Sequence, residues 1–186
     1  MKSLNRQSGM SLIEILVTVV VLGVGLLGAA ALQMTSINSN QSGHIRSQAS
    51  AIAEDLQSRI KAAKFTTYSI STPTTLDVVL ESYRGSPYTC NGGVTMCRNS
   101  STGSASECTV ADLTVYDRWE VCRLAQDELP EGEVYVNHNG IRATIAVAWT
   151  PIAARDDGGQ MSILNPQCAS MGIANTKDCI LLEIIP

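Results

Sequence analysis

One carboxylate stands at the start of a long apolar run, where an acidic side chain is costly. Glu14 lies in the stretch RQSGMSLIEILV and directly precedes Ile15–Leu32, which has no charged residue and one hydroxyl group, that of Thr18. A charged side chain at the centre of a bilayer costs roughly 2.5 to 3.5 kcal/mol, and the cost falls near the headgroups. Glu14 therefore either reaches the headgroup region or serves a specific purpose at the beginning of the run.

Six cysteines are the second group of residues that could do chemistry. They are Cys90, Cys97, Cys108, Cys122, Cys168 and Cys179. All of them follow the apolar run, and an even number of cysteines is typical of proteins from an oxidising compartment. None of their spacings is the C-x-x-C of redox motifs and zinc knuckles. The cysteines therefore predict disulfides rather than a metal site.

Geometry limits how these cysteines can pair. If residues 109–129 form a helix, Cys108 and Cys122 stand about 21 Å apart along it, far beyond the roughly 7 Å limit between bridged Cα atoms. Cys168 with Cys179 closes a short loop before the last expected strand, and it is the preferred bridge. Cys122 would then reach back to one of two earlier cysteines, Cys90 or Cys97.

The remaining polar candidates predict no active site. His44 and His138 are too few and too separate for a metal or catalytic centre, and both are expected on the solvated surface. Asp156 and Asp157 are adjacent, whereas calcium loops space their ligands, so we expect an ordinary polar turn there. The chain has no nucleophile elbow, paired catalytic acids or phosphate-binding glycine loop. We therefore expect no enzymatic activity, no cofactor and no metal.

The elements that must position these residues begin with a membrane span. At about 1.5 Å per residue, Ile15–Leu32 covers roughly 27 Å, close to a hydrocarbon thickness of about 30 Å. Lys2 and Arg6 precede it, with no acid before Glu14, and this excess of positive charge predicts a cytoplasmic N-terminus and an exported remainder. From Gln33 onward, 11 basic residues against 16 acidic ones give a formal charge of −5. No basic patch is present, which disfavours nucleic-acid binding.

An apolar stripe continues the helical pattern beyond the span and predicts one long helix over Met10–Lys64. Its first half would lie in lipid and its second half would pack on a head domain. Gly23, Gly25 and Gly28 fit close packing between membrane helices and equally fit a stretchable segment. The stripe consists of Met34, Ile37, Ile45, Ile52, Leu56 and Ile60, with Ala49, Ala53 and Ala63 on the same face.

The head is expected to be mixed α and β. Residues 65–108 are rich in Ser, Thr, Gly and Pro and predict mostly loop, with a short helix at Thr75–Tyr83. Thr109 with Asp112 forms a capping-box pattern, and Pro130 with Gly132 ends the helix expected from residue 109 to residue 129. Two β-rich runs, residues 133–137 and 142–149, flank the turn sequence NHNG and predict a hairpin. The run CILLEII adds an edge or central strand.

Three interpretations compete for residues 1–33: a secretory signal peptide, a plain membrane anchor, or a pilin leader and stem. The run is long for a signal peptide, and a plain anchor leaves Glu14 unexplained. The stretch SGMSLIEILVTVVVLGVGLLGAAAL resembles the N-terminal signature of type IV pilins and pseudopilins. The resemblance implies that a prepilin peptidase cuts between Gly9 and Met10, that the Met10 amine is methylated, and that Glu14 becomes the fifth mature residue.

The new ammonium would suit Glu14 physically. Met10 and Glu14 are four residues apart, on one helix face and about 6 Å apart along the axis, and an acid in the first turn is favoured by the helix dipole. In a bundle of subunits, Glu14 pairing with the Met10 amine of a neighbouring chain would neutralise two charges in lipid and fix the axial offset between subunits. Glu14 would then serve as a registration device.

The head sequence, through ADLTVYDRW, ELPEG and IAVAW, resembles PilV-type minor pilins of type IV pili. The implied α+β fold is a type IV pilin fold, in which a long helix packs on a small antiparallel sheet with disulfides. Its parts are a leader (1–9), a transmembrane stem (10–33), an amphipathic stem (34–64) and a periplasmic head (65–186).

The resemblance also implies a function and a location. The protein would be an inner-membrane subunit with a cytoplasmic N-terminus that later enters the fibre or its tip. There it would prime pilus assembly and support twitching motility and adhesion. Its partners would be other minor pilins, the major pilin, the prepilin peptidase, the inner-membrane assembly machinery and a tip adhesin. Two alternatives stay open: a minor pseudopilin of a type II secretion system, and an uncut membrane-anchored periplasmic binding protein or sensor.

Overall fold

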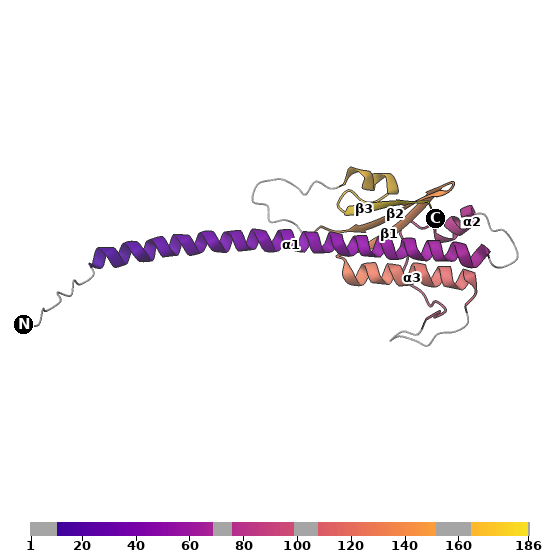
Figure 1. The fold of residues 1–186 in the computed structure, drawn as a ribbon, viewed down its shortest axis with the longest axis horizontal. Helices are drawn as coiled ribbons and strands as arrows, with labels where there is room; N and C mark the ends of the chain where they lie inside the picture. The colour runs from indigo at the N-terminus through magenta and orange to yellow at the C-terminus, as the bar shows by residue number, and fades with distance from the viewer. Residues whose placement is uncertain (1–10, 69–75, 99–107, 152–164, 186) are drawn as a thin grey trace, which may run out of the picture. The chain divides into compact units, whose positions relative to one another are not determined.

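A single long helix dominates the N-terminal part of the chain. The computed structural model describes residues 11–68, 76–98, 108–151 and 165–185, so the expectations for Gly9, Met10, Asp156 and Asp157 lie outside the described residues. Helix α1 runs over Leu12–Tyr68 (Figure 1). It continues four residues past the expected Lys64, because no glycine or proline occurs before Pro73.

The chain divides into two compact units, Met1–Gln41 and Ser42–Pro186. The first unit contains the N-terminal part of α1, and the second contains the rest of α1 together with the head elements. Because helix α1 belongs to both units, its two parts meet different surroundings. They are therefore described separately.

Two shorter helices occupy the positions that the sequence predicts. Helix α2 covers Leu76–Tyr83, and helix α3 covers Val110–Glu128. The capping box of α3 is present in full, because the Thr109 side chain accepts from the Asp112 backbone N–H and the Asp112 carboxylate accepts from the Thr109 N–H. After α3 the chain turns so tightly that a Cβ on Gly132 would lie 2.0 Å from the Ala125 carbonyl oxygen. Glycine is therefore required there.

Three antiparallel strands form one sheet in the order β1-β2-β3. Strand β1 is Glu133–Asn139, β2 is Arg142–Trp149 and β3 is Asp178–Ile184. The predicted hairpin is confirmed, although β1 extends two residues beyond the expected Asn137. The extension arises because the turn is only two residues long, and Gly140 has a φ of +59° at its first position, as in a type II′ turn.

Each face of the sheet is covered by different elements. Val134, Ile145 and Val147 point to one face and join a core with side chains of α1, α2 and α3. In the second unit, α1 lies between α3 and the sheet in Figure 1. The opposite face, with Tyr135 and Ala146, is covered by the 3-10 helix η1 (Pro166–Met171) and the residues after it.

The side chains of α1 that enter this core belong to the predicted stripe. They are Ile45, Ala49, Ile52, Ala53, Leu56, Ile60 and Ala63. Met34 and Ile37, which continue the same pattern toward the N-terminus, are exposed. The long apolar helix, the small antiparallel sheet and the disulfides together fit an α+β type IV pilin fold.

Candidate membrane and assembly helix

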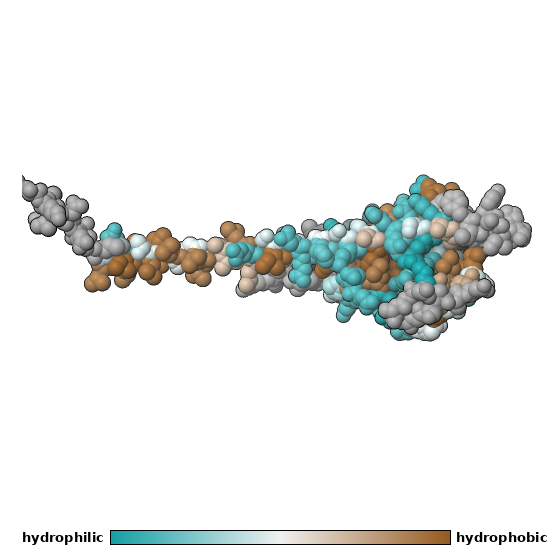
Figure 2. All heavy atoms as spheres, turned by 60° about the horizontal axis from the view of Figure 1, so that its bottom comes forward, coloured by the Kyte–Doolittle hydropathy of each residue, from teal (hydrophilic) through white to brown (hydrophobic). Residues whose placement is uncertain are grey.

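The N-terminal part of α1 exposes an apolar surface that no part of the described chain covers. Within the described residues, one helix is long and apolar enough to cross a membrane, and none of its most apolar window is buried. Figure 2 shows these hydrophobic residues gathered along the helix. Fully burying a Leu, Val or Ile side chain is worth about 1.5 to 3 kcal/mol, so this surface favours lipid or other apolar helices. The exposed residues include Leu12, Ile13, Leu16, Val20, Leu22, Leu26 and Leu27.

Two threonine hydroxyls on this part of the helix are satisfied within the helix. Thr18 Oγ1 donates to the Ile15 carbonyl oxygen at 2.8 Å, and Thr35 Oγ1 donates to the Ala31 carbonyl oxygen at 3.2 Å. Hydroxyls bonded back to the preceding turn carry no unmet donor into an apolar medium. Thr18 therefore adds no polar cost to the run, and the nearest charged group is Glu14, directly before it.

Glu14 lies in the first turn of α1 and points to the surface. The backbone N–H groups of Glu14 and Ile15 both donate to the Ser11 carbonyl oxygen, at 3.0 and 3.3 Å. Among the described residues, the Glu14 carboxylate has no hydrogen bond or ion pair. The helix dipole stabilises an acid in this turn, but only modestly, by about 0.3 to 1 kcal/mol. A cation supplied from outside the described residues would stabilise it further.

The glycines of this helix have no packing role within the described chain. A Cβ added at Gly23, Gly25 or Gly28 would meet nothing within 4 Å. The helix is nevertheless continuous through all three positions. Close packing against a neighbouring helix would give these glycines a purpose that this chain alone does not.

Three disulfides hold the head. Cys168 is bonded to Cys179, which is the bridge preferred from the sequence. Cys122 is bonded to Cys90, one of its two candidates. The third bridge joins the remaining two cysteines, Cys97 and Cys108, across the segment that precedes α3.

An ion-pair network between α1 and α3 was not predicted. Arg59 Nε donates to Asp55 Oδ2 at 2.8 Å, Arg59 Nη1 donates to Asp117 Oδ1 at 2.8 Å, and Nη1 also contacts Glu120. The Tyr83 hydroxyl donates to the other oxygen of Asp117 at 2.9 Å. The Arg59 side chain is only 12% exposed and that of Asp117 only 6%. The i to i+4 spacing of Asp55 and Arg59 was the one visible signal, and it marks a helix surface rather than a buried site.

The pKa values of two groups in this network, Arg59 and Tyr83, are both raised, but for different reasons. Burial alone would lower the pKa of Arg59, but hydrogen bonds to Glu120 and Asp117 outweigh it and raise that pKa. Burial, reinforced by the charge of Asp117, raises the pKa of the Tyr83 hydroxyl. Arg59 therefore remains charged and Tyr83 remains a donor. The network links the stem helix to the head through a charged arginine and a neutral hydroxyl donor.

Both histidines were expected on the solvated surface. His44 is exposed as expected, whereas the side chain of His138 is largely buried. The side chain of His138 is only 11% exposed, and its Nε2 lies 2.7 Å from Glu81 Oε2. The hydrogen bond with His138 lowers the pKa of Glu81. The prediction of a solvated His138 is wrong because α2 packs beside β1 and brings Glu81 over the imidazole, a contact between residues 57 positions apart.

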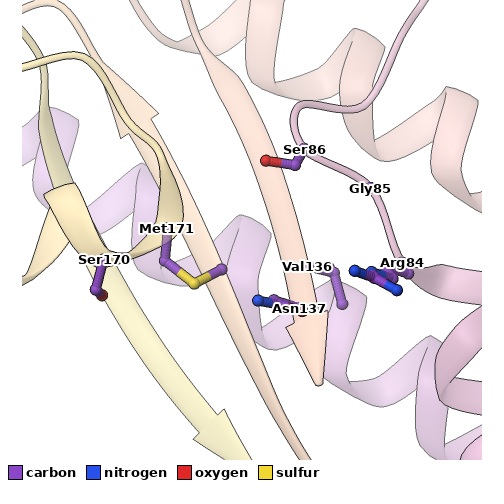
Figure 3. A pocket seen from close by; sticks show the side chains of 7 residues that line it. All are labelled: Arg84, Gly85, Ser86, Val136, Asn137, Ser170 and Met171. Carbon is purple, nitrogen blue, oxygen red and sulfur yellow. The ribbon is translucent and has the colours of Figure 1, made fainter. Parts of the chain in front are cut away.

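One cavity of about 220 Å³ lies beside β1 (Figure 3). Figure 3 shows Arg84 on one side of the strand and Ser170 with Met171 on the other. The cavity is also lined by Gly85, Ser86, Val136 and Asn137, and Arg84 is the one lining residue with a charged side chain. Within the described residues, no group of three or more His, Cys, Asp and Glu side chains could hold a metal ion. The lining supplies no base for either serine.

Comparison with known protein families agrees with the geometry of the N-terminal helix. Residues 4–30 match the prokaryotic N-terminal methylation motif. No curated protein and no solved structure is significantly similar to the chain. The motif is the prepilin signal of type IV pilins and pseudopilins, so it supports a pilin-like structural subunit that is anchored in a membrane and processed by a prepilin peptidase. The match ends at residue 30, so the head lies outside it.

Proposed function

We propose that this protein is a minor pilin that helps prime assembly at the tip of a type IV pilus and supports twitching motility and adhesion. The observation that carries the proposal is the coincidence of the methylation motif with an apolar helix that the described chain leaves uncovered. A surface of that kind requires lipid before assembly and neighbouring helices after it. The disulfide-bonded head would face the periplasm and then the cell surface.

Assembly would depend on an ion pair between subunits. Cleavage after Gly9 would leave the Met10 ammonium one helical turn before Glu14. Glu14 would pair with the Met10 amine of an adjacent subunit and so set the axial position of each helix against the next. Other minor pilins and the major pilin would supply the neighbouring helices, delivered by the inner-membrane machinery, and a tip adhesin would contact the heads.

The first experiment determines the mature N-terminus. Mass spectrometry of the full chain extracted from the inner membrane is expected to find a polypeptide that begins with N-methyl-Met10. A chain that retains Met1 would instead indicate an uncut membrane anchor and would contradict the proposal.

The second experiment tests Glu14. Glu14→Ala is expected to lower incorporation into the fibre by more than about tenfold, because breaking an ion pair in a low-dielectric site costs about 3 to 5 kcal/mol. Glu54→Ala is the matched control, since Glu54 is an exposed acid on the same helix. Glu14→Gln keeps the shape of the side chain and removes its charge, so it tests the contribution of the charge alone. Equal incorporation of the Glu14 and Glu54 variants, measured by immunoblot of sheared fibres, would exclude the registration role.

A deletion strain separates a pilus from a secretion system, because the N-terminal motif serves both. Loss of surface pili and twitching with normal secretion is the expected result. Loss of secreted proteins with normal pili would identify a minor pseudopilin of a type II secretion system instead.

A further inference from the structure

The two edges of the sheet differ in how their backbone groups are satisfied. On the outer edge of β1, Gly85 and Val136 exchange hydrogen bonds of 3.0 and 2.8 Å. Tyr88 N–H donates to the Val134 carbonyl oxygen at 2.8 Å, so the segment after α2 covers this edge. Further along β1, the His138 N–H donates to the side chain of the preceding asparagine at 2.9 Å. This edge is closed.

The outer edge of β3 is closed only at its start. The Cys179 N–H donates to Asp178 Oδ1 at 2.9 Å, and the other oxygen of Asp178 binds Arg46. Alternate residues of an antiparallel strand turn their backbone groups to opposite edges, so Leu181 and Glu183 follow Cys179 on the outer edge. Within residues 11–68, 76–98, 108–151 and 165–185, no hydrogen bond reaches the outward N–H and C=O groups of these two residues.

The side chains of β3 leave apolar surface exposed near its outer edge. Its sequence, DCILLEI, is a nearly continuous apolar run, which is typical of a strand with both faces covered. Ile180 and Leu182 are only partly buried against the helical core, and Leu181 is only partly buried on the opposite face. Ile185, directly after the strand, is 58% exposed. Common devices that protect an exposed edge are proline, charged side chains and bulges. Beyond Asp178, β3 has no proline, lysine or bulge, and Glu183 is its one charged residue.

We propose that the outer edge of β3 binds an extended segment of another pilus subunit, which adds a fourth strand to the sheet. The inference rests on the proposed function. Leu181 and Glu183 would each offer one N–H and one C=O to the added strand, and Ile185 would become buried. The partner would carry alternating apolar side chains and a basic residue opposite Glu183. The Glu183 side chain is exposed, and its Oε2 lies 4.0 Å from Arg142 Nη1.

Charge favours a different subunit over a second copy of this chain. The part of the chain from Gln33 onward has a formal charge of −5, so two such heads repel each other. Pairing β3 with itself would also bring a second Glu183 to the same short edge. A partner with basic side chains meets neither penalty.

A proline substitution tests the edge without removing a bond inside the sheet. Glu183→Pro removes an N–H that faces away from β2, and proline is tolerated on edge strands in this orientation. Glu183→Ala is the matched control, because it removes the same carboxylate and keeps the N–H. The experiment captures the full chain and measures how much of each identified pilus subunit is recovered with it. Glu183→Pro is expected to lower the recovery of one subunit about tenfold, and Glu183→Ala is expected to lower it by less than about threefold. Equal recovery with both variants would overturn the proposal.

Hydrogen exchange of the unmodified chain provides a second test that no folding defect can obscure. The amides of Leu181 and Glu183 are expected to exchange rapidly in the detergent-solubilised single subunit and at least about tenfold more slowly in the assembled complex. Protection already present in the single subunit would mean that this chain covers its own edge. Protection that depends only on the concentration of this chain would mean a second copy. Either result, or equal exchange in both states, overturns the proposal.

The two proposals fail in different ways. An uncut chain, or one that never joins a fibre, contradicts the pilin function itself. A chain that is cut and assembled normally, but whose Leu181 and Glu183 amides remain unprotected, contradicts the added strand alone.

Discussion

Helix α1 exposes its apolar side chains in the first unit of the chain and buries them in the second. Leu22, in the first unit, is 64% exposed, whereas Leu56, in the second, is fully buried. The apolar residues of the first unit surround the helix, while those of the second form one stripe against the sheet and α3. The first part is therefore suited to an apolar environment outside the chain, and the second part contributes to the core of the head.

Arg59 is expected to give the largest effect, confined to the head. Arg59→Met removes the nearest cation from the buried Asp117, whose other cation, Arg98, is more exposed and 3.9 Å away, and this should lower the free energy of unfolding by about 3 to 5 kcal/mol. Thermal and denaturant unfolding of the full chain in detergent would measure the change. The double variant Arg59→Met/Asp117→Asn is expected to recover part of the loss, and failure of Arg59→Met to destabilise would show that the network is not a structural link.

Two leucines provide a matched pair that tests the comparison directly. Leu56→Ala is expected to cost about 2 to 5 kcal/mol of head stability, because it leaves a cavity in a packed core. Leu22→Ala removes the same atoms from an exposed site and should change head unfolding by less than about 0.5 kcal/mol. Denaturant midpoints of both variants provide the measurement. Similar losses for the two variants would mean that the first unit also packs on the head.

Alkaline pH should weaken the head through its buried tyrosines. Burial raises the pKa of Tyr83 and of Tyr88, so their neutral form stabilises the folded state. This contribution is complete below the unfolded tyrosine pKa of about 10 and is lost as pH rises through the folded value. Unfolding followed between pH 8 and pH 12 should show a falling melting temperature together with tyrosinate absorbance.

Tyr83→Phe separates the hydroxyl from the ring. It removes the donor to Asp117 and should cost about 1 to 3 kcal/mol at neutral pH. It should also reduce the alkaline decline, because one of the tyrosines whose pKa is raised in the folded state is gone. An unchanged alkaline profile would assign the decline to other groups.

The smallest expected effect is at the start of α3. Thr109→Ala removes the side chain that caps the helix and should cost about 0.5 to 2 kcal/mol. Hydrogen bonds from Thr109 lower the pKa of Asp112, so this contribution is present above the unfolded Asp pKa and is lost as pH falls through the folded value. Melting temperatures at pH 7 and pH 3 should therefore differ less in Thr109→Ala than in the unchanged chain.

The elements were predictable wherever the signal is local. The capping box, the hairpin and the apolar stripe each depend on residues within a few positions of one another, and all three appear in the structure. The length of the turn was harder to predict, because the sequence NHNG is compatible with several tight turns. The positive φ of Gly140 in the structure defines the two-residue form. The motif around Glu14 was visible for the same local reason, although Met10 lies outside the described residues.

The sequence by itself determined the apolar helix, its acid, the order of the head elements and the expectation of disulfides, because composition and short-range periodicity encode these features. Only the tertiary structure decided that Cys97 bonds Cys108, that Arg59 meets Asp117, that His138 is covered, and that β3 lies at an open edge. Except for the cysteine bridge, these contacts join different elements of the fold. Such pairings depend on how whole elements pack, and single-sequence patterns do not carry that information.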